Sequence, residues 1–254
     1  MKLSELFRRH DSPGPAELHR QLSLWYAHPA RARALRELRA LLMRYLNDRF
    51  GYYALKLASF TVPDDCPVET RTRFSFHLGP CGADAQLRFE ALPIEAESVD
   101  LIIALHTLEF TDDPHLVLRE FDRVLIPDGY LIVVGFNPYG RPSLLKPLHL
   151  RRGVPWCGHF HSSWQLQEWL SVLGFAVEEI DSCVVPWVCR AYERPFGRWA
   201  KLLPRLGDLL VLKACKKVSR LTPLPELSSR RRLSLKGVMQ QPTAFKPDLP
   251  VADD

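Results

Sequence analysis

The stretch from residue 98 to residue 136, SVDLIIALHTLEFTDDPHLVLREFDRVLIPDGYLIVVGF, decides the fold class. It opens with SVDLIIALH and closes with YLIVVGF, near-continuous apolar runs that are typical of strands buried on both faces of a parallel sheet. Between the runs, Asp112 or Asp113 can cap a helix that has Pro114 at its first position. The residues 127–129, Pro-Asp-Gly, supply the turn into the second strand. This stretch therefore predicts a strand–helix–strand unit of a parallel α/β sheet.

Further elements are predicted on both sides of this unit. Strand patterns occupy residues 52–60, 73–78 and 85–89 before it and residues 176–185 and 207–218 after it, and a capped helix occupies residues 162–174. Strands that alternate with helices in this way favour the α/β class. We predict a mostly parallel sheet with helices on both faces, preceded by an N-terminal helical segment.

The N-terminal region, residues 1–50, is predicted to hold a loose polar leader followed by a basic amphipathic helix. Between residues 17 and 47, leucines recur at helical spacing while most arginines occupy other faces. Such a helix could lie on an anionic membrane or on RNA. We favour a lid helix with a solvated basic face.

The excess positive charge of the chain lies in its last part. Residues 213–254 carry nine Lys/Arg and four Asp/Glu, which accounts for the whole net charge of +5. Residues 221–254 are predicted to be a disordered tail after an α/β domain that spans residues 51–220. The tail could add non-specific affinity for nucleic acid. Because the tail has no repeated pattern of aromatic residues among its charges and no RNA-binding motif, a solubilising role is the favoured reading.

Composition excludes several classes of protein. No apolar run of the 254-residue chain approaches the roughly 18 residues that a membrane span needs, and the first 30 residues lack a secretory signal, so a cytoplasmic protein is expected. The six cysteines form no Cys-x-x-Cys pair, which favours free thiols. Cys157, His159 and His161 alternate as metal ligands on a strand would, but no second cluster completes four ligands. We predict no metal.

Residues 92–138 resemble the class I S-adenosylmethionine-dependent methyltransferases, in the branch often labelled type eleven. That branch typically reads L-P-F, then F-D and an apolar strand, L-E-H, a D-P helix start, L-R-E and R-V-L-x-P-G-G. The counterparts here are Leu92-Pro93-Ile94, Val99-Asp100, Leu108-Glu109-Phe110, Asp113-Pro114, Leu118-Arg119-Glu120, Arg123-Val124-Leu125 and Pro127-Asp128-Gly129. The resemblance implies a Rossmann-like methyltransferase fold and S-adenosylmethionine as the cofactor.

The part of the chain that should hold the cofactor departs from the family pattern. Members have a Gly-rich loop after the first strand, an acid at the end of the second and an Asp at the end of the third. Here Ser59 and Phe60 replace the glycines, the second strand ends at Gly79-Pro80, and Arg88 replaces the Asp. The 24 residues 61–84 cannot hold a strand and two crossover helices. We therefore expect an abbreviated, degenerate N-terminal half.

Candidate site residues follow the predicted strands, at the edge where such sheets bind ligands. We expect Ser59, Arg88, His106, Thr107 and Glu109 to contact the cofactor. An ordinary helix-entry loop is the alternative for the last three. For Arg88 the alternatives are a surface ion pair and a pocket that accepts a negative ligand.

Asn137 and Tyr139 follow the strand over 130–136 and are the candidates for substrate contact, with a simple loop as the alternative. Methyl transfer relies mainly on positioning and desolvation, so it needs no acid–base pair in the sequence. We predict an S-adenosylmethionine-dependent methyltransferase. The alternative is an inactive methyltransferase fold that serves as a binding or regulatory protein. The sequence names neither the methyl acceptor nor the oligomeric state.

Overall fold

The computed structural model describes residues 14–47, 51–60, 72–79, 85–86, 88–140, 157–183 and 207–217. The chain divides into a compact unit, Met1–Ser219, and a second unit, Arg220–Asp254, none of whose residues is described. The predicted tail and all of the predicted leader up to residue 13 thus lie outside the described residues.

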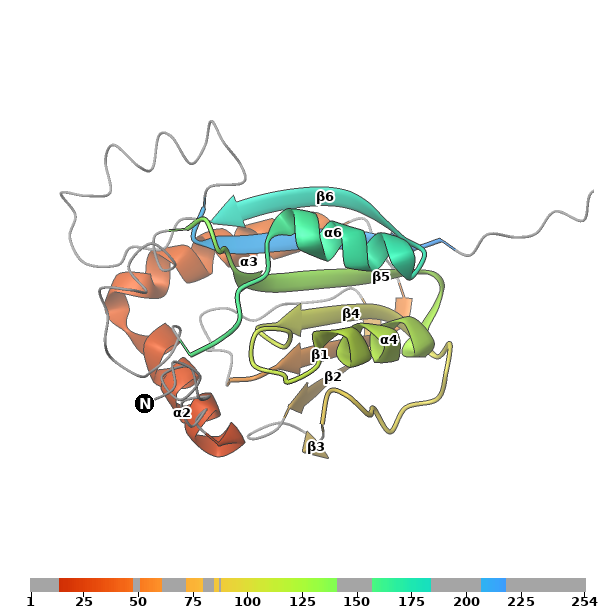
Figure 1. Cartoon of the computed structure of the whole chain (residues 1–254), viewed down its shortest axis with the longest axis horizontal. Coiled ribbons are helices and arrows are strands. Elements are labelled where there is room, and N and C mark those ends of the chain that lie inside the picture. The colour runs from red at the N-terminus through yellow and green to blue at the C-terminus, as the bar shows by residue number, and fades with distance from the viewer. Residues whose placement is uncertain are drawn as a thin grey trace, which may run out of the picture. The chain divides into compact units, whose positions relative to one another are not determined.

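One seven-stranded sheet forms the centre of the first unit (Figure 1). Its strands are β1 (Gly51–Ala58), β2 (Thr72–Gly79), β3 (Ala85–Gln86), β4 (Val99–Leu105), β5 (Leu125–Phe136), β6 (Phe175–Cys183) and β7 (Leu209–Lys216). The spatial order is β3-β2-β1-β4-β5-β7-β6. Strands β1 to β5 are parallel, and β7 runs antiparallel to β5 and β6. The predicted mostly parallel sheet is confirmed.

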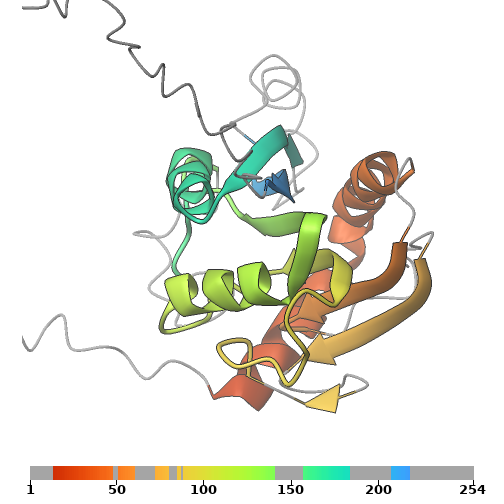
Figure 2. The ribbon, with the colours of Figure 1, turned by 90° about the vertical axis from the view of Figure 1, so that its right-hand side faces the viewer.

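Helices cover both faces of this sheet, as predicted (Figure 2). Helices α4 (Pro114–Val124) and α6 (Ser163–Val172) pack on one face, and α2 (Pro15–Ala27) and α3 (Ala32–Leu46) lie on the other side. The helical region predicted over 17–47 is thus two helices, joined by a 3-10 turn at Pro29–Arg31. Among the described residues, no helix is both long and apolar enough to cross a membrane.

Helix α4 forms as its sequence dictates. The Asp113 carboxylate accepts hydrogen bonds from the backbone N–H groups of His115 and Leu116, and Pro114 begins the helix. Its apolar stripe contains Phe121, which is fully buried against the sheet. The predicted turn before the second strand is an irregularity inside β5, where Asp128 adopts a positive φ of 61°.

The N-terminal half of the sheet is abbreviated. Five residues, 80–84, lie between the parallel strands β2 and β3, whereas a crossover normally needs a dozen or more. Five residues are too few for a crossover helix, which agrees with the prediction that this region cannot hold two of them. Residues 61–71 lie outside the described residues. The N-terminal helices α2 and α3 instead supply the apolar cover for strands β1, β4 and β5 on this face.

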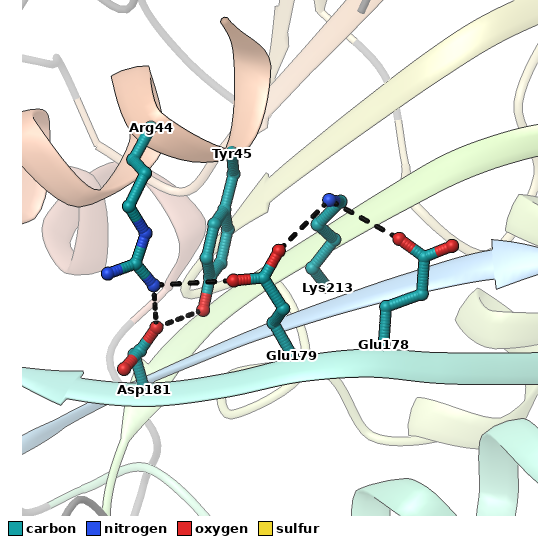
Figure 3. A network of polar contacts seen from close by, with 6 residues as sticks. All are labelled: Arg44, Tyr45, Glu178, Glu179, Asp181 and Lys213. Atoms are coloured by element: carbon teal, nitrogen blue, oxygen red, sulfur yellow. Dashed lines mark hydrogen bonds and ion pairs between the residues drawn. The ribbon is translucent and has the colours of Figure 1, made fainter. Parts of the chain in front are cut away.

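A polar network joins α3 to the antiparallel end of the sheet (Figure 3). The Tyr45 hydroxyl donates to Asp181 at 2.7 Å, and Arg44 contacts the same carboxylate. The Lys213 ammonium group lies 3.2 Å from Glu179 Oε1, and its side chain is only 7% exposed. Charges that leave water in this way are tolerated because each has a partner of opposite sign.

The Tyr45 hydroxyl should make stability depend on pH in the alkaline range. Burial, followed by the hydrogen bond to Asp181, raises the Tyr45 pKa well above its ordinary value of 10.0. Above pH 10 the unfolded chain therefore releases a proton that the folded chain keeps, and the free energy of unfolding falls as pH rises. We expect Tyr45→Phe to lose less stability between pH 9 and pH 11 than the wild type in urea unfolding. Equal losses would contradict this account.

Candidate functional site

A pocket of about 400 Å³ lies where strands β1 and β4 end. Helix α2 forms one wall of it through Pro15 and Leu18, so the N-terminal helix crosses the carboxyl edge of the sheet (Figure 1). A volume of this size suits one small-molecule ligand. The lining residues are Pro15, Leu18, Ser59, Arg88, Phe89, Glu90, Thr107, Glu109, Phe110, Thr111, Asp112, Cys157 and His159.

The ends of β1 and β4 are fixed to each other beneath this pocket. The Ser59 hydroxyl donates to the backbone carbonyl of His106 at 3.0 Å. His106 follows β4 directly and adopts a positive φ of 53°, a left-handed conformation that is uncommon for residues other than glycine. The turn at His106 takes the chain out of the sheet, and the next residue, Thr107, lines the pocket. The Thr107 hydroxyl is buried and has no hydrogen-bond partner among the described residues.

Four groups form a buried chain of hydrogen bonds next to the pocket. The Tyr26 hydroxyl lies 2.5 Å from His106 Nε2, and His106 Nδ1 lies 3.0 Å from Glu109 Oε1. The same carboxylate oxygen accepts the backbone N–H of Phe136 at 2.5 Å. Through its two ring nitrogens, His106 thus joins the Tyr26 hydroxyl of α2 to the Glu109 carboxylate. Glu109 Oε2 has no partner among the described residues.

Aromatic side chains cover the end of β1. Phe60, which stands where the family has a glycine, stacks on Tyr26 with 4.5 Å between ring centroids and 13° between planes. Trp25 meets Phe136 edge-on at 5.4 Å. These contacts anchor α2 over the sheet edge.

The residues before α6 hold the loop after β4 from the other side. The His159 N–H donates to the backbone carbonyl of Glu109, and His161 Nε2 lies 3.2 Å from that of Leu108. Burial lowers the pKa of His161, so its ring is neutral near pH 7 and can donate to this carbonyl. The loop that carries Thr107 and Glu109 is therefore held in place along its length.

The charged side chains of the pocket are mostly acidic. Glu90 Oε1 accepts a hydrogen bond from the Thr111 hydroxyl at 2.6 Å, and Asp112 and Glu109 add two more carboxylates. Arg88 lies 3.7 Å from Glu90, and its side chain is 86% exposed. The surface ion pair, one of the two alternatives for Arg88, is thus observed in a residue that also borders the pocket. The charge of this pocket favours a cationic ligand.

Of the predicted site residues, four come together and three do not line the pocket. Ser59, Arg88, Thr107 and Glu109 line it, while His106 lies fully buried beneath it.

The two candidates for substrate contact lie apart from the described pocket. The Asn137 side chain is buried and donates to the Gly207 carbonyl, and it also accepts the Tyr139 N–H. Tyr139 is 63% exposed. Substrate contact by these two residues stays a prediction.

Tyr26 and Glu90 are among the residues of this site that the sequence does not single out. Tyr26 was counted within a helical pattern, and nothing in its local sequence indicates a contact 80 positions away. Glu90 was considered only as a surface partner of Arg88. The one available signal is its position two residues after Arg88, which stands where the family has the Asp at the end of its third strand. The described residues contain no group of three His, Cys, Asp or Glu that could hold a metal ion.

Comparison with known proteins gives a family-model match and a relative that is similar along most of the chain. A family model described as "Methyltransferase domain" matches residues 77–133. The uncharacterized protein YafS of Escherichia coli K12 is 31% identical over 203 residues, which cover 76% of this chain and 82% of YafS. A demethylmenaquinone methyltransferase of Chlamydia pneumoniae is 37% identical over 73 residues, 26% of this chain and 30% of that protein.

Solved structures show the same fold at low sequence identity. The crystal structure of a SAM-dependent methyltransferase from Thermotoga maritima has a TM-score of 0.56 at 17% identity, covering 80% of this chain and 99% of that one. The likeness to YafS extends along most of both chains, and the family match covers the β4–α4–β5 unit that decided the fold class. The protein therefore belongs to the same family as YafS, its fold is that of the SAM-dependent methyltransferases, and its residues 77–133 match the methyltransferase-domain model.

Proposed function

We propose that this protein binds S-adenosylmethionine in the pocket beneath α2 and transfers its methyl group to an acceptor whose identity the pocket does not specify. The observation that carries the proposal is the position of the pocket, at the carboxyl ends of β1 and β4 of a methyltransferase sheet. Open parallel sheets bind their ligands at this edge.

The residues present fit such a cofactor although the family signature is altered. A buried hydroxyl on Thr107 and a buried oxygen on Glu109 lack partners among the described residues, and a bound ligand would supply them. The acidic lining suits a molecule that carries a sulfonium and an ammonium group. When bound, S-adenosylmethionine supplies the activated methyl group. The protein's part is to orient the ligand and exclude water from the pocket that α2 covers.

Glu90 is the residue best placed to replace the missing acid of the second strand. Its carboxylate lines the pocket, and one of its oxygens is already oriented by Thr111. A carboxylate can accept hydrogen bonds from two neighbouring hydroxyls, which is the chemistry that ribose recognition requires. We assign the ribose contact to Glu90.

Glu90→Gln is expected to weaken S-adenosylmethionine binding about tenfold or more, because hydrogen bonds to a charged acceptor contribute about 1.5–3 kcal/mol. The loss should be the same for S-adenosylhomocysteine and methylthioadenosine, which share the ribose. Thermal unfolding of the variant with each ligand measures it. Glu95→Gln is the matched control, since Glu95 is exposed and is not among the lining residues. Equal affinities for both variants would remove Glu90 from the site.

One observation favours the alternative of a binding or regulatory protein. The stack of Phe60 on Tyr26 occupies the end of β1, where the family has its Gly-rich loop. If the wild type fails to bind any of the three ligands, this stack closes the cofactor site and the alternative is preferred.

A further inference from the structure

We propose that Glu109 holds a positively charged group of the ligand, and that Tyr26 and His106 are positioning residues that fix its carboxylate for this contact. The inference rests on the proposed function, because it assigns a role within the same pocket.

The hydrogen bonds of Glu109 are unevenly distributed over its two oxygens. Oε1 accepts from the Phe136 N–H and from His106 Nδ1, whereas Oε2 has no partner among the described residues. The side chain is only 3% exposed, so bulk water does not supply a hydrogen bond to Oε2. A buried carboxylate is costly unless it is paired with a charge and its oxygens are hydrogen-bonded. Two hydrogen bonds therefore fix the position of Oε1, whereas Oε2 has no hydrogen bond from the described residues.

The described neighbours of Glu109 place no positively charged group against Oε2. His106 Nδ1 contacts only the other oxygen, Oε1, and His161 Nε2 is bonded to the Leu108 carbonyl. The guanidinium group of Arg88 is exposed and contacts Glu90. A ligand cation is therefore the group that would complete the site.

S-adenosylmethionine offers two such cations, a sulfonium and an ammonium. S-adenosylhomocysteine keeps the ammonium group but has a neutral thioether, and methylthioadenosine has neither charge. The three ligands share adenosine, so their relative affinities isolate the contribution of each cation.

Tyr26 and His106 determine where the Glu109 carboxylate lies. His106 is held in an uncommon backbone conformation at the end of β4 and is bonded on both ring nitrogens. Tyr26 belongs to α2, the helix that forms a wall of the pocket, and its ring is fixed by the stack on Phe60. Docking of α2 and orientation of the carboxylate are thus linked through one hydrogen bond.

A structural role for Glu109 is the competing explanation. A cavity of about 10 Å³ lies beside Glu109 and His161, which is room for about one water molecule. A water bound there could satisfy Oε2 without any ligand. In that case, replacing Glu109 would change the fold and affect all ligands alike.

The test is calorimetric titration of the wild type, Glu109→Gln and Glu109→Asp with the three ligands. We expect Glu109→Gln to weaken S-adenosylmethionine binding about tenfold or more and to leave methylthioadenosine within about twofold. If S-adenosylhomocysteine keeps its affinity, the group that Glu109 holds is the sulfonium; if it loses affinity as well, the group is the ammonium. Equal changes for all three ligands, or none, would overturn the proposal. Glu109→Asp keeps the charge and provides a folded variant if Gln is not tolerated.

Tyr26→Phe tests the positioning role. It keeps the stack on Phe60 and removes the hydroxyl, so the ratio of S-adenosylmethionine to methylthioadenosine affinity should fall in the same direction as in Glu109→Gln, by about threefold or more. Tyr45→Phe is the matched control, a buried tyrosine on α3 whose hydroxyl contacts Asp181, and it should leave the ratio unchanged. An unchanged ratio in Tyr26→Phe would contradict the positioning role. Failure of the wild type to bind any ligand would instead overturn the proposed function.

Discussion

Replacing Gly135 with alanine is expected to destabilise the fold by about 2 kcal/mol or more and to remove most of the affinity for S-adenosylmethionine. A Cβ atom at this position would lie 2.7 Å from Glu109 Oε1. That oxygen is bonded to the Phe136 N–H and to His106, so the carboxylate cannot move without losing buried hydrogen bonds. Urea unfolding and ligand titration of Gly135→Ala measure the two effects.

The sign of the change in unfolding free energy distinguishes a clash with Glu109 from the usual effect of replacing a strand glycine with alanine. A glycine inside a strand is normally unfavourable, so alanine would be stabilising by about 0.5–1 kcal/mol if no side chain were in the way. The shorter carboxylate of Glu109→Asp should make room for the added methyl group. The double variant Gly135→Ala/Glu109→Asp is therefore expected to be more stable than the sum of its single changes predicts. Strict additivity would mean that Gly135 is not packed against Glu109.

Phe121→Ala is expected to lower the free energy of unfolding by about 3–5 kcal/mol. Phe121 is fully buried between α4 and the sheet, in the same cluster as Ile102 and Leu131. Its removal leaves a cavity that neighbouring strands cannot close without leaving their register. The matched control is Leu116→Ala on the same helix, whose side chain is 42% exposed and should cost less than about 1 kcal/mol. Similar losses for both variants would mean that α4 is not the packed element described here.

Residues 98–136 could be predicted because each signal in them is local. The cap at Asp113, the proline after it and the turn at Asp128 each act within a few residues of their own position. The apolar runs of β4 and β5 are buried on both faces, so their sequence alone indicates their place in the sheet.

The parts that could not be predicted depend on contacts between distant residues. The bond between Tyr26 and His106 requires α2 to cross the edge of the sheet, and no periodicity encodes where a helix docks. The N-terminal region was treated as a segment ahead of the domain, yet α2 and α3 bury their apolar stripes in the same cluster as β1 and β4. Because the five residues between β2 and β3 are too few for a crossover helix, that face of the sheet needs another cover there, and the N-terminal helices pack on the same face.

The candidate site residues follow from their positions after predicted strands more than from their residue types. Ser59, Thr107 and Glu109 are candidates because they follow strands, and the topology, which brings strand ends together, places them around one pocket. Asn137 follows a strand as well, but its side chain is engaged by the Gly207 carbonyl. Position after a strand therefore selects candidates, but it does not show which of their polar groups are already engaged by other parts of the chain.

The central claim is that the altered N-terminal half still forms a cofactor site. Calorimetric titration of the wild-type chain with S-adenosylmethionine tests it most directly. The account predicts saturable binding of one molecule per chain, accompanied by a rise in unfolding free energy of about 2.7 kcal/mol at a hundredfold excess over the Kd. No heat of binding and no stabilisation at millimolar ligand, with a folded protein, would contradict it and leave the sheet as a scaffold for another partner.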